Sequence, residues 1–328
     1  MGNRKRAGAK SAKERICNMI RRVSFLNMTP EEWRERRSKT IGGSDAGALL
    51  GLNPFKSPYA LWAEKTGKAI PEDISDKEAV RLGHDLEEYV AQRFTEATGK
   101  KVRRDNNFVY NDKYPFAHVQ ADRLVVGEDS GLECKTTSSW ETLKKCREGE
   151  FPDTWYSQCV HAMMVTGAKK WYLAVLCFGH GFFWFEIERD EAEIAALAKA
   201  EAEFWGKVKN DIAPPVDGMD STTGAIKAVF SQSRSGMSVD LTPMMAEIAA
   251  WRATKAQIKT LEAQLTEQQN RICTYMGQAE SGICGDHKVS WKTQTRRTFD
   301  TKRFAADHPH ISLEMYYKTT ESRPFKLS

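Results

Sequence analysis

The segment GLECKTT, residues 131–137, combines a strand-like pattern with an acid and a base two positions apart. On a β-strand, residues i and i+2 point to the same face of the sheet. Glu133 and Lys135 are therefore expected to lie side by side, while Leu132 and Cys134 face the core. Such a charged pair is either an ordinary feature of an exposed strand face or part of a catalytic site.

A second acid precedes this segment in HVQADRL. By the same parity, His118, Gln120 and Asp122 share one face of the preceding predicted strand, so Asp122 and Glu133 can converge if the two strands pair. Two carboxylates this close repel each other unless a cation lies between them. Oxygen ligands favour Mg²⁺ or Mn²⁺, and a neighbouring lysine can position water or stabilise charge on a phosphate.

A third acid lies on a long predicted helix, residues 76–99, which Gly99 ends. Glu87 is close to the apolar stripe of this helix and is expected to face inward, whereas Glu88 is expected to face water. With Glu87 the site would hold two metal ions about 4 Å apart. The alternative interpretation is an acid on the helix surface.

The hydrophobic periodicity predicts an α/β (α+β) fold with a central mixed β-sheet flanked by helices. Period-two patterns at 101–110, 116–126 and 131–137 predict three strands, and 170–188 predicts a hairpin. Helices are predicted from the capping signal at TPEEW (29–33), after IGGSDAGALLG (41–51), and at 57–67, 76–99, 153–167 and 190–210.

The chain has 328 residues and a formal net charge of +5. It has no apolar run long enough for a membrane span, and its seven cysteines form no CxxC pair, so we expect a cytoplasmic protein without disulfides, zinc or iron–sulfur clusters. The predicted organisation is a disordered basic tail (1–24), a first domain (25–212), a linker (213–239) and a C-terminal module (240–328).

The C-terminal module combines a heptad seam with a basic end. Apolar residues recur every seven positions from Met244 to Ile272, which predicts a long helix that packs on a partner. The stretch 288–304 interleaves aromatic and basic residues. We expect phosphate contacts from Arg296 and Arg297, while the aromatic residues either stack on unpaired bases or form a small core.

Several motifs together resemble a known family over residues 28–210. The chain is similar to the lambda exonuclease type of nuclease, the YqaJ-like viral recombinase family of the PD-(D/E)xK superfamily. This resemblance implies a restriction-endonuclease-like core. The matching motifs are W-x3-R (Trp33, Arg37), IGGSD (41–45), LGHDLE (82–87), QAD (120–122), GLECK (131–135) and WYSQ…MMVTG (155–167).

The resemblance implies roles for individual residues. Gly42 and Gly43 leave backbone N–H groups accessible to an anion at a predicted helix start, Ser44 adds a hydroxyl, and Arg37 can clamp a phosphate bidentately. The alternative interpretation is an ordinary capped helix. By resemblance, Arg37 and Ser44 hold a 5′-phosphate, Glu87, Asp122 and Glu133 bind metal, Lys135 is catalytic, and Gln158 supports the site.

The family pattern differs here at two points. Gln120 stands where a small hydroxyl residue is expected, and SSWE (138–141) lacks an expected arginine, for which Lys144 or Lys145 are the candidate substitutes. The resemblance implies a Mg²⁺-dependent phage or prophage DNA exonuclease that resects duplex DNA from the 5′ end. It also implies a single-strand annealing protein as partner and a ring-shaped homo-oligomer. The alternatives are an endonuclease of the same superfamily and a DNA-binding recombination scaffold.

Overall fold

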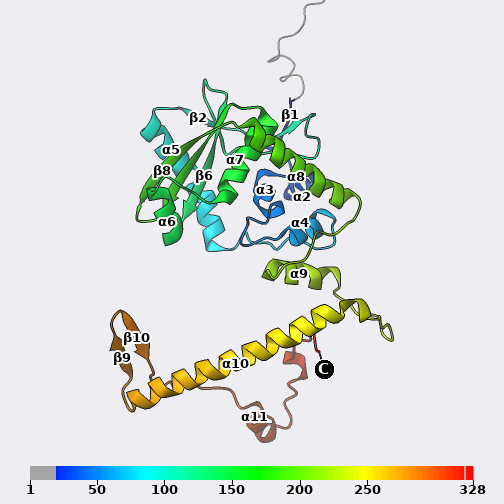
Figure 1. Cartoon of the computed structure of the whole chain (residues 1–328), viewed down its shortest axis with the longest axis vertical. Coiled ribbons are helices and arrows are strands. Elements are labelled where there is room, and N and C mark those ends of the chain that lie inside the picture. Colours follow the sequence, from blue (N-terminus) through cyan, green and yellow to red (C-terminus); the bar gives the residue numbers. More distant parts are fainter. Residues whose placement is uncertain (1–19, 321–322, 328) are drawn as a thin grey trace, which may run out of the picture. The chain divides into compact units, whose positions relative to one another are not determined.

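The structure is a computed structural model that describes residues 20–320 and 323–327 (Figure 1). The chain divides between Ser231 and Gln232 into two compact units, which are described separately. Most of the predicted disordered tail lies outside the described residues. In the described parts of the chain, no helix is both long and apolar enough to cross a lipid bilayer.

A five-stranded mixed sheet forms the centre of the first unit, which confirms the predicted fold class. Strands β6 and β7 run parallel, and the other neighbouring strands run antiparallel. The order is β2 (Val102–Arg104), β5 (Arg123–Val125), β6 (Ser130–Thr137), β7 (Lys170–Cys177) and β8 (Gly181–Glu188).

The central strand β6 is covered on both faces. Leu132 packs in a core cluster with Phe94 of helix α5 (Glu78–Thr98). Glu133 pairs in register with Leu173 of β7, which packs in the core cluster that contains much of helix α7 (Asp153–Thr166). The predicted alternation of faces is therefore correct, but the face that carries Glu133 is not open surface.

A smaller sheet holds the polypeptide that leads to Asp122. The predicted strands 101–110 and 116–126 are each split between the two sheets, and Asp122 lies in the break between β4 and β5. Residues 20–24, predicted as part of the disordered tail, pair with β3 instead. The order is β1 (Ile20–Ser24), β3 (Asn107–Asn111) and β4 (His118–Val119).

The helices that begin at Pro30, Gly43, Pro58 and Glu191 start within two residues of the predicted positions, whereas the helix at 140–147 was not predicted. The Thr29 hydroxyl accepts from the backbone N–H of Glu32, whose carboxylate accepts in turn from the N–H of Thr29. The backbone at Gly42 packs closely against His118 of β4. A Cβ added to this glycine would lie 3.0 Å from a carbon of the His118 ring. These helices are α2 (Pro30–Ser38), α3 (Gly43–Leu49), α4 (Pro58–Lys65), α6 (Trp140–Arg147) and α8 (Glu191–Lys209).

The first part of the predicted linker is folded. Helix α9 (Asp220–Val229) packs on α4, and its Thr222 and Ala225 are buried. The hydroxyl of Thr222 is 2.7 Å from that of Ser57, the cap of α4. Polar composition suggested a linker, but these contacts extend the first unit to Ser231.

In the second unit no residue of 232–320 or 323–327 is buried. Its main element is α10, where Ile258 is 50% exposed and Leu265 is 65% exposed. The last fifty residues, whose pattern predicts short strands and turns, also contain a short helix that Asp300 caps. The elements are α10 (Met245–Met276), β9 (Ser281–Cys284), β10 (His287–Ser290), α11 (Thr301–Asp307), and the 3-10 turns Thr242–Met244 and Glu314–Tyr316.

Candidate active site

A cleft of about 640 Å³ in the first unit gathers most of the predicted site residues. Lys144 and Lys145 lie in the last turn of α6 and do not line it. Arg296 and Arg297 belong to the second unit. The predicted residues that line the cleft are Arg37, Gly43, Ser44, Glu87, Asp122, Glu133, Lys135 and Gln158.

Glu133, Lys135 and Gln158 form a closed triangle of polar contacts. The Lys135 Nζ is 2.7 Å from Glu133 Oε1, as expected for residues i and i+2 of one strand. The amide of Gln158, on α7, accepts from Lys135 Nζ at 2.9 Å and donates to Glu133 Oε1 at 2.6 Å. Gln158 therefore fixes both charged groups from the helix that covers their face of the sheet.

Lys135 keeps its proton in this environment. Burial lowers the pKa of its ammonium group, but the negative charges of Glu133 and Asp122 outweigh burial and raise that pKa above its usual value. Lys135 therefore places a positive charge beside the two carboxylates.

Asp122 lies in the break between the two sheets, which brings its carboxylate to β6. Its Oδ2 accepts from the backbone N–H of Cys134 at 2.7 Å. Burial and the nearby Glu133 charge raise the pKa of Asp122 well above its usual value. The half-buried Asp122 and the buried Glu133 thus form a pair of acids whose ionised form calls for additional positive charge.

Glu87 is placed differently from the prediction. It faces inward as expected, but its carboxylate pairs with the Arg123 guanidinium, which also contacts Glu88 at 3.1 Å. The side chain of Arg123 is only 2% exposed. Within the described residues, no three His, Cys, Asp or Glu side chains gather closely enough to hold a metal ion. Sequence reasoning missed Arg123, although it directly follows Asp122.

The residues predicted to hold a phosphate line the same cleft. The Arg37 Nη2 of α2 donates to the Ser44 hydroxyl of α3 at 2.5 Å. The Arg37 guanidinium also lies over the Trp33 ring, 5.1 Å from its centre. Both side chains of the W-x3-R motif therefore face the cleft, and the stacked ring and the Ser44 hydroxyl orient the arginine.

A buried ion pair holds this pocket in place. The Asp45 carboxylate is 2.7 Å from Lys65 Nζ, which also donates to the backbone carbonyl groups of Arg37 and Thr40. Burial raises the pKa of Asp45, but Lys65 and Arg37 lower it more, so the carboxylate stays ionised. The N–H of Gly42, expected to face an anion, donates to Asp45 instead.

A second buried network supports the strand before Asp122. The ring of His161 contacts Glu201 Oε1 at 2.6 Å and the His118 carbonyl oxygen at 2.8 Å. Burial lowers the pKa of His161, but Glu201 raises it above its usual value, which favours the protonated ring. His161 is one helical turn after Gln158, and sequence reasoning missed this pair because its residues are 40 positions apart.

Comparison with known proteins agrees with the resemblance seen in the motifs. Residues 32–169 match the YqaJ-like viral recombinase domain. The chain is 38% identical over 302 residues to the uncharacterized protein YqaJ of Bacillus subtilis, covering 91% of this chain and 94% of that protein. The similarity therefore extends beyond the first unit.

Two solved structures are also similar. An alkaline exonuclease from Laribacter hongkongensis is 20% identical, with 56% of this chain and 94% of that chain covered and a TM-score of 0.47. A phage-related exonuclease from Haemophilus somnus is 11% identical, with 55% and 100% covered and a TM-score of 0.36.

Proposed function

Since this chain belongs to the YqaJ-like viral recombinase family, we propose that it is a metal-dependent DNA exonuclease of phage-type recombination. It resects one strand of duplex DNA from the 5′ end and leaves a 3′ single strand. The observation that carries the proposal is that one cleft is lined both by an acid–lysine–amide triangle and by an oriented arginine.

The donor set fits a hard divalent cation in part. Asp122 and Glu133 provide carboxylate oxygens, which Mg²⁺ and Mn²⁺ prefer, and burial raises the need for a counter-charge. Glu87 would join them only after releasing Arg123. A bound Mg²⁺ would supply charge to polarise the phosphodiester, and the residues available to hold a second ion are the same carboxylates.

Phosphodiester hydrolysis breaks one P–O ester bond as water attacks the phosphorus, and negative charge builds up on the phosphoryl oxygens. Lys135, held as a cation by Glu133 and Asp122, is positioned to stabilise that charge. Gln158 keeps the ammonium group and the Glu133 carboxylate in a fixed geometry. The chain therefore offers electrostatic stabilisation that needs no rearrangement during the reaction.

Arg37 and Ser44 support recognition of a 5′-phosphate, because an arginine oriented by stacking and by a hydroxyl can make charge-assisted bonds to phosphate oxygens. The partners proposed are duplex DNA and a single-strand annealing protein, and the location is the host cytoplasm. A ring-shaped homo-oligomer is proposed as well, and the exposed apolar seam of α10 supports self-association.

The decisive experiment uses the purified full chain with Mg²⁺ on linear duplex DNA, labelled at either end, with and without 5′-phosphate. We expect progressive loss of the 5′ label, faster digestion of phosphorylated ends, an intact covalently closed circle and no reaction with a chelator. Cleavage of the circle would establish the endonuclease alternative. Binding of DNA without cleavage under any divalent metal would establish the scaffold alternative.

A further inference from the structure

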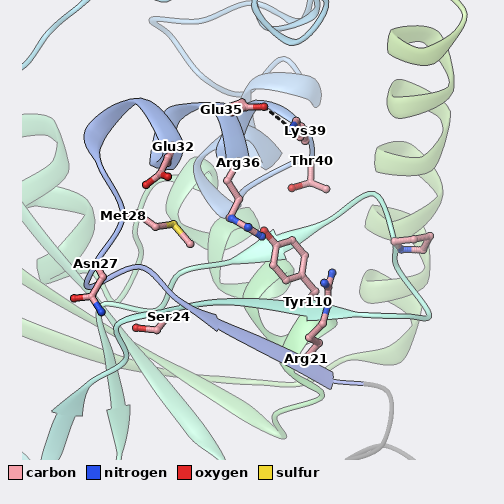
Figure 2. Close-up of a pocket in the computed structure, with 11 residues that line it drawn as sticks. Arg21, Ser24, Asn27, Met28, Glu32, Glu35, Arg36, Lys39, Thr40 and Tyr110 are labelled. Carbon is pink, nitrogen blue, oxygen red and sulfur yellow. Dashed lines mark hydrogen bonds and ion pairs between the residues drawn. The ribbon is translucent and has the colours of Figure 1, made fainter.

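A second cleft, of about 710 Å³, lies on another face of α2 (Figure 2). Trp33 and Arg37 line the active-site cleft. Glu32, Glu35 and Arg36 line the second cleft. Residues three and four apart share a face of a helix, so each set occupies its own face of α2. Helix α2 therefore lies between the two clefts and contributes side chains to both.

The acids of the second cleft already have partners. Glu32 accepts the backbone N–H of Thr29 at 2.8 Å, and Glu35 is 2.6 Å from Lys39 Nζ. In contrast, neither Arg36 nor Arg21 has a carboxylate partner among the described residues, although Arg36 is half-buried. The lining carries three cations (Arg21, Arg36 and Lys39) against two carboxylates (Glu32 and Glu35), which leaves a net charge of +1 that a bound anion would compensate.

The two arginines approach the same aromatic ring. Arg21, from β1, stacks on Tyr110 of β3 with its guanidinium carbon 4.9 Å from the ring centre. Figure 2 shows Arg36 reaching toward Tyr110 from α2, so the two guanidinium groups point to one region of the cleft. Stacking on the ring orients Arg21 and leaves the edge of its guanidinium group for phosphate oxygens.

One hydrogen bond joins the walls of the two clefts. Thr40 lines the second cleft, and its hydroxyl is 2.8 Å from Nδ1 of His118, which lines the active-site cleft. The Lys65 ammonium group also donates to the backbone carbonyl oxygen of Thr40 at 2.8 Å and so holds Thr40 in place. Helix α2, about 10 Å in diameter, and the hydrogen-bonded side chains of Thr40 and His118 thus separate the two clefts.

We propose that the second cleft binds the phosphodiester backbone of a nucleic-acid strand that also occupies the active-site cleft. Arg21 and Arg36 contact its phosphates. This inference rests on the proposed function, because it extends the DNA-binding surface of that site to the other face of α2. The paired acids limit the cleft to a few phosphate contacts, and the strand belongs either to the duplex or to a single-stranded extension.

The test measures binding of a fluorescent single-stranded oligonucleotide and of a blunt duplex to the full chain, by anisotropy in a chelator. The variants are Arg21→Ala and Arg36→Ala. Arg34→Ala is the matched control, because Arg34 lies on α2, pairs with Glu31 at 2.9 Å and lines neither cleft. Circular dichroism melting checks that each variant is folded.

We expect each cleft variant to weaken binding about tenfold and Arg34→Ala to change it little. The slope of log Kd against log salt should fall by about 0.7 per lost contact for a single strand, or about 0.9 for a duplex. The DNA form with the larger loss is the one that occupies the cleft. Equal losses in Arg36→Ala and Arg34→Ala would overturn the assignment.

Wild-type cleavage separates the two proposals. If the wild-type protein digests DNA with Mg²⁺ while the cleft variants bind like Arg34→Ala, only the second cleft is assigned wrongly. If the wild-type protein neither binds nor cleaves DNA, the proposed function fails, and the assignment of the second cleft fails with it.

Discussion

The two units of this chain differ most in what they bury. The first buries apolar residues together with charged ones, including Asp45, Glu133 and the His161–Glu201 pair. In the second, the described residues are all at least partly exposed, and Leu265 of α10 is 65% exposed. Buried charges are stable only when their partners are fixed, so the first unit must be rigid where its site lies. In the second unit, by contrast, the apolar seam of α10 is exposed among the described residues.

Loss of a charge in the site should have the largest effect. We expect Glu133→Gln to lower the Mg²⁺-dependent cleavage rate by about a hundredfold or more, because Lys135 and Gln158 lose the carboxylate that they contact. The fold should persist, since the substitution conserves size. Glu188→Gln, at an exposed position of β8, is the control and should retain its rate. Equal rates in both variants would remove Glu133 from the mechanism.

Loss of the buried pair should affect stability next. Glu201→Gln leaves His161 without a counter-charge in a fully buried position, which should lower the free energy of unfolding by about 3–5 kcal/mol. Urea denaturation measures this change, with the exposed Glu203→Gln of the same helix as control. A loss as small as that of the control would show that the pair is neutral or dispensable.

Acid should weaken the first unit through His118. Burial, followed by the charge of His161, lowers the pKa of this ring from 6.5 to about 3. Between these values the unfolded chain binds more protons than the folded one, so stability falls with falling pH by up to about 1.4 kcal/mol per pH unit. Unfolding in urea at several pH values should show this slope reduced in His118→Gln. An unchanged slope would mean that another group is responsible.

Removal of the second unit should have the smallest effect on stability. A chain that ends at Ser231 keeps the contact of α9 with α4. Its urea midpoint should therefore match the midpoint at which the first unit unfolds in the full chain. A chain that ends at Asp211 loses the contact of Thr222 with Ser57 and should unfold at lower urea concentration. Insoluble protein in the Ser231 version would show that the first unit does not fold alone.

Some features of this protein follow from local sequence. The capping residues Thr29 and Ser57 start helices, because their side chains bond backbone N–H groups within the same turn. The period of two in β6 places Glu133 and Lys135 on one face. These interactions link residues a few positions apart, so the sequence alone was sufficient to predict them. The family motifs gave the identity of the residues in the cleft.

Only the tertiary structure decided how those residues are partnered. Arg123 pairs with Glu87, and α9 joins the first unit despite its polar composition. The split of the predicted strand at Asp122, and the His161–Glu201 pair, likewise depend on how distant segments pack. Local periodicity gives the direction of a side chain but not the element that covers it. The free energy of a buried charge depends on that covering element, which brings groups far apart in sequence into contact.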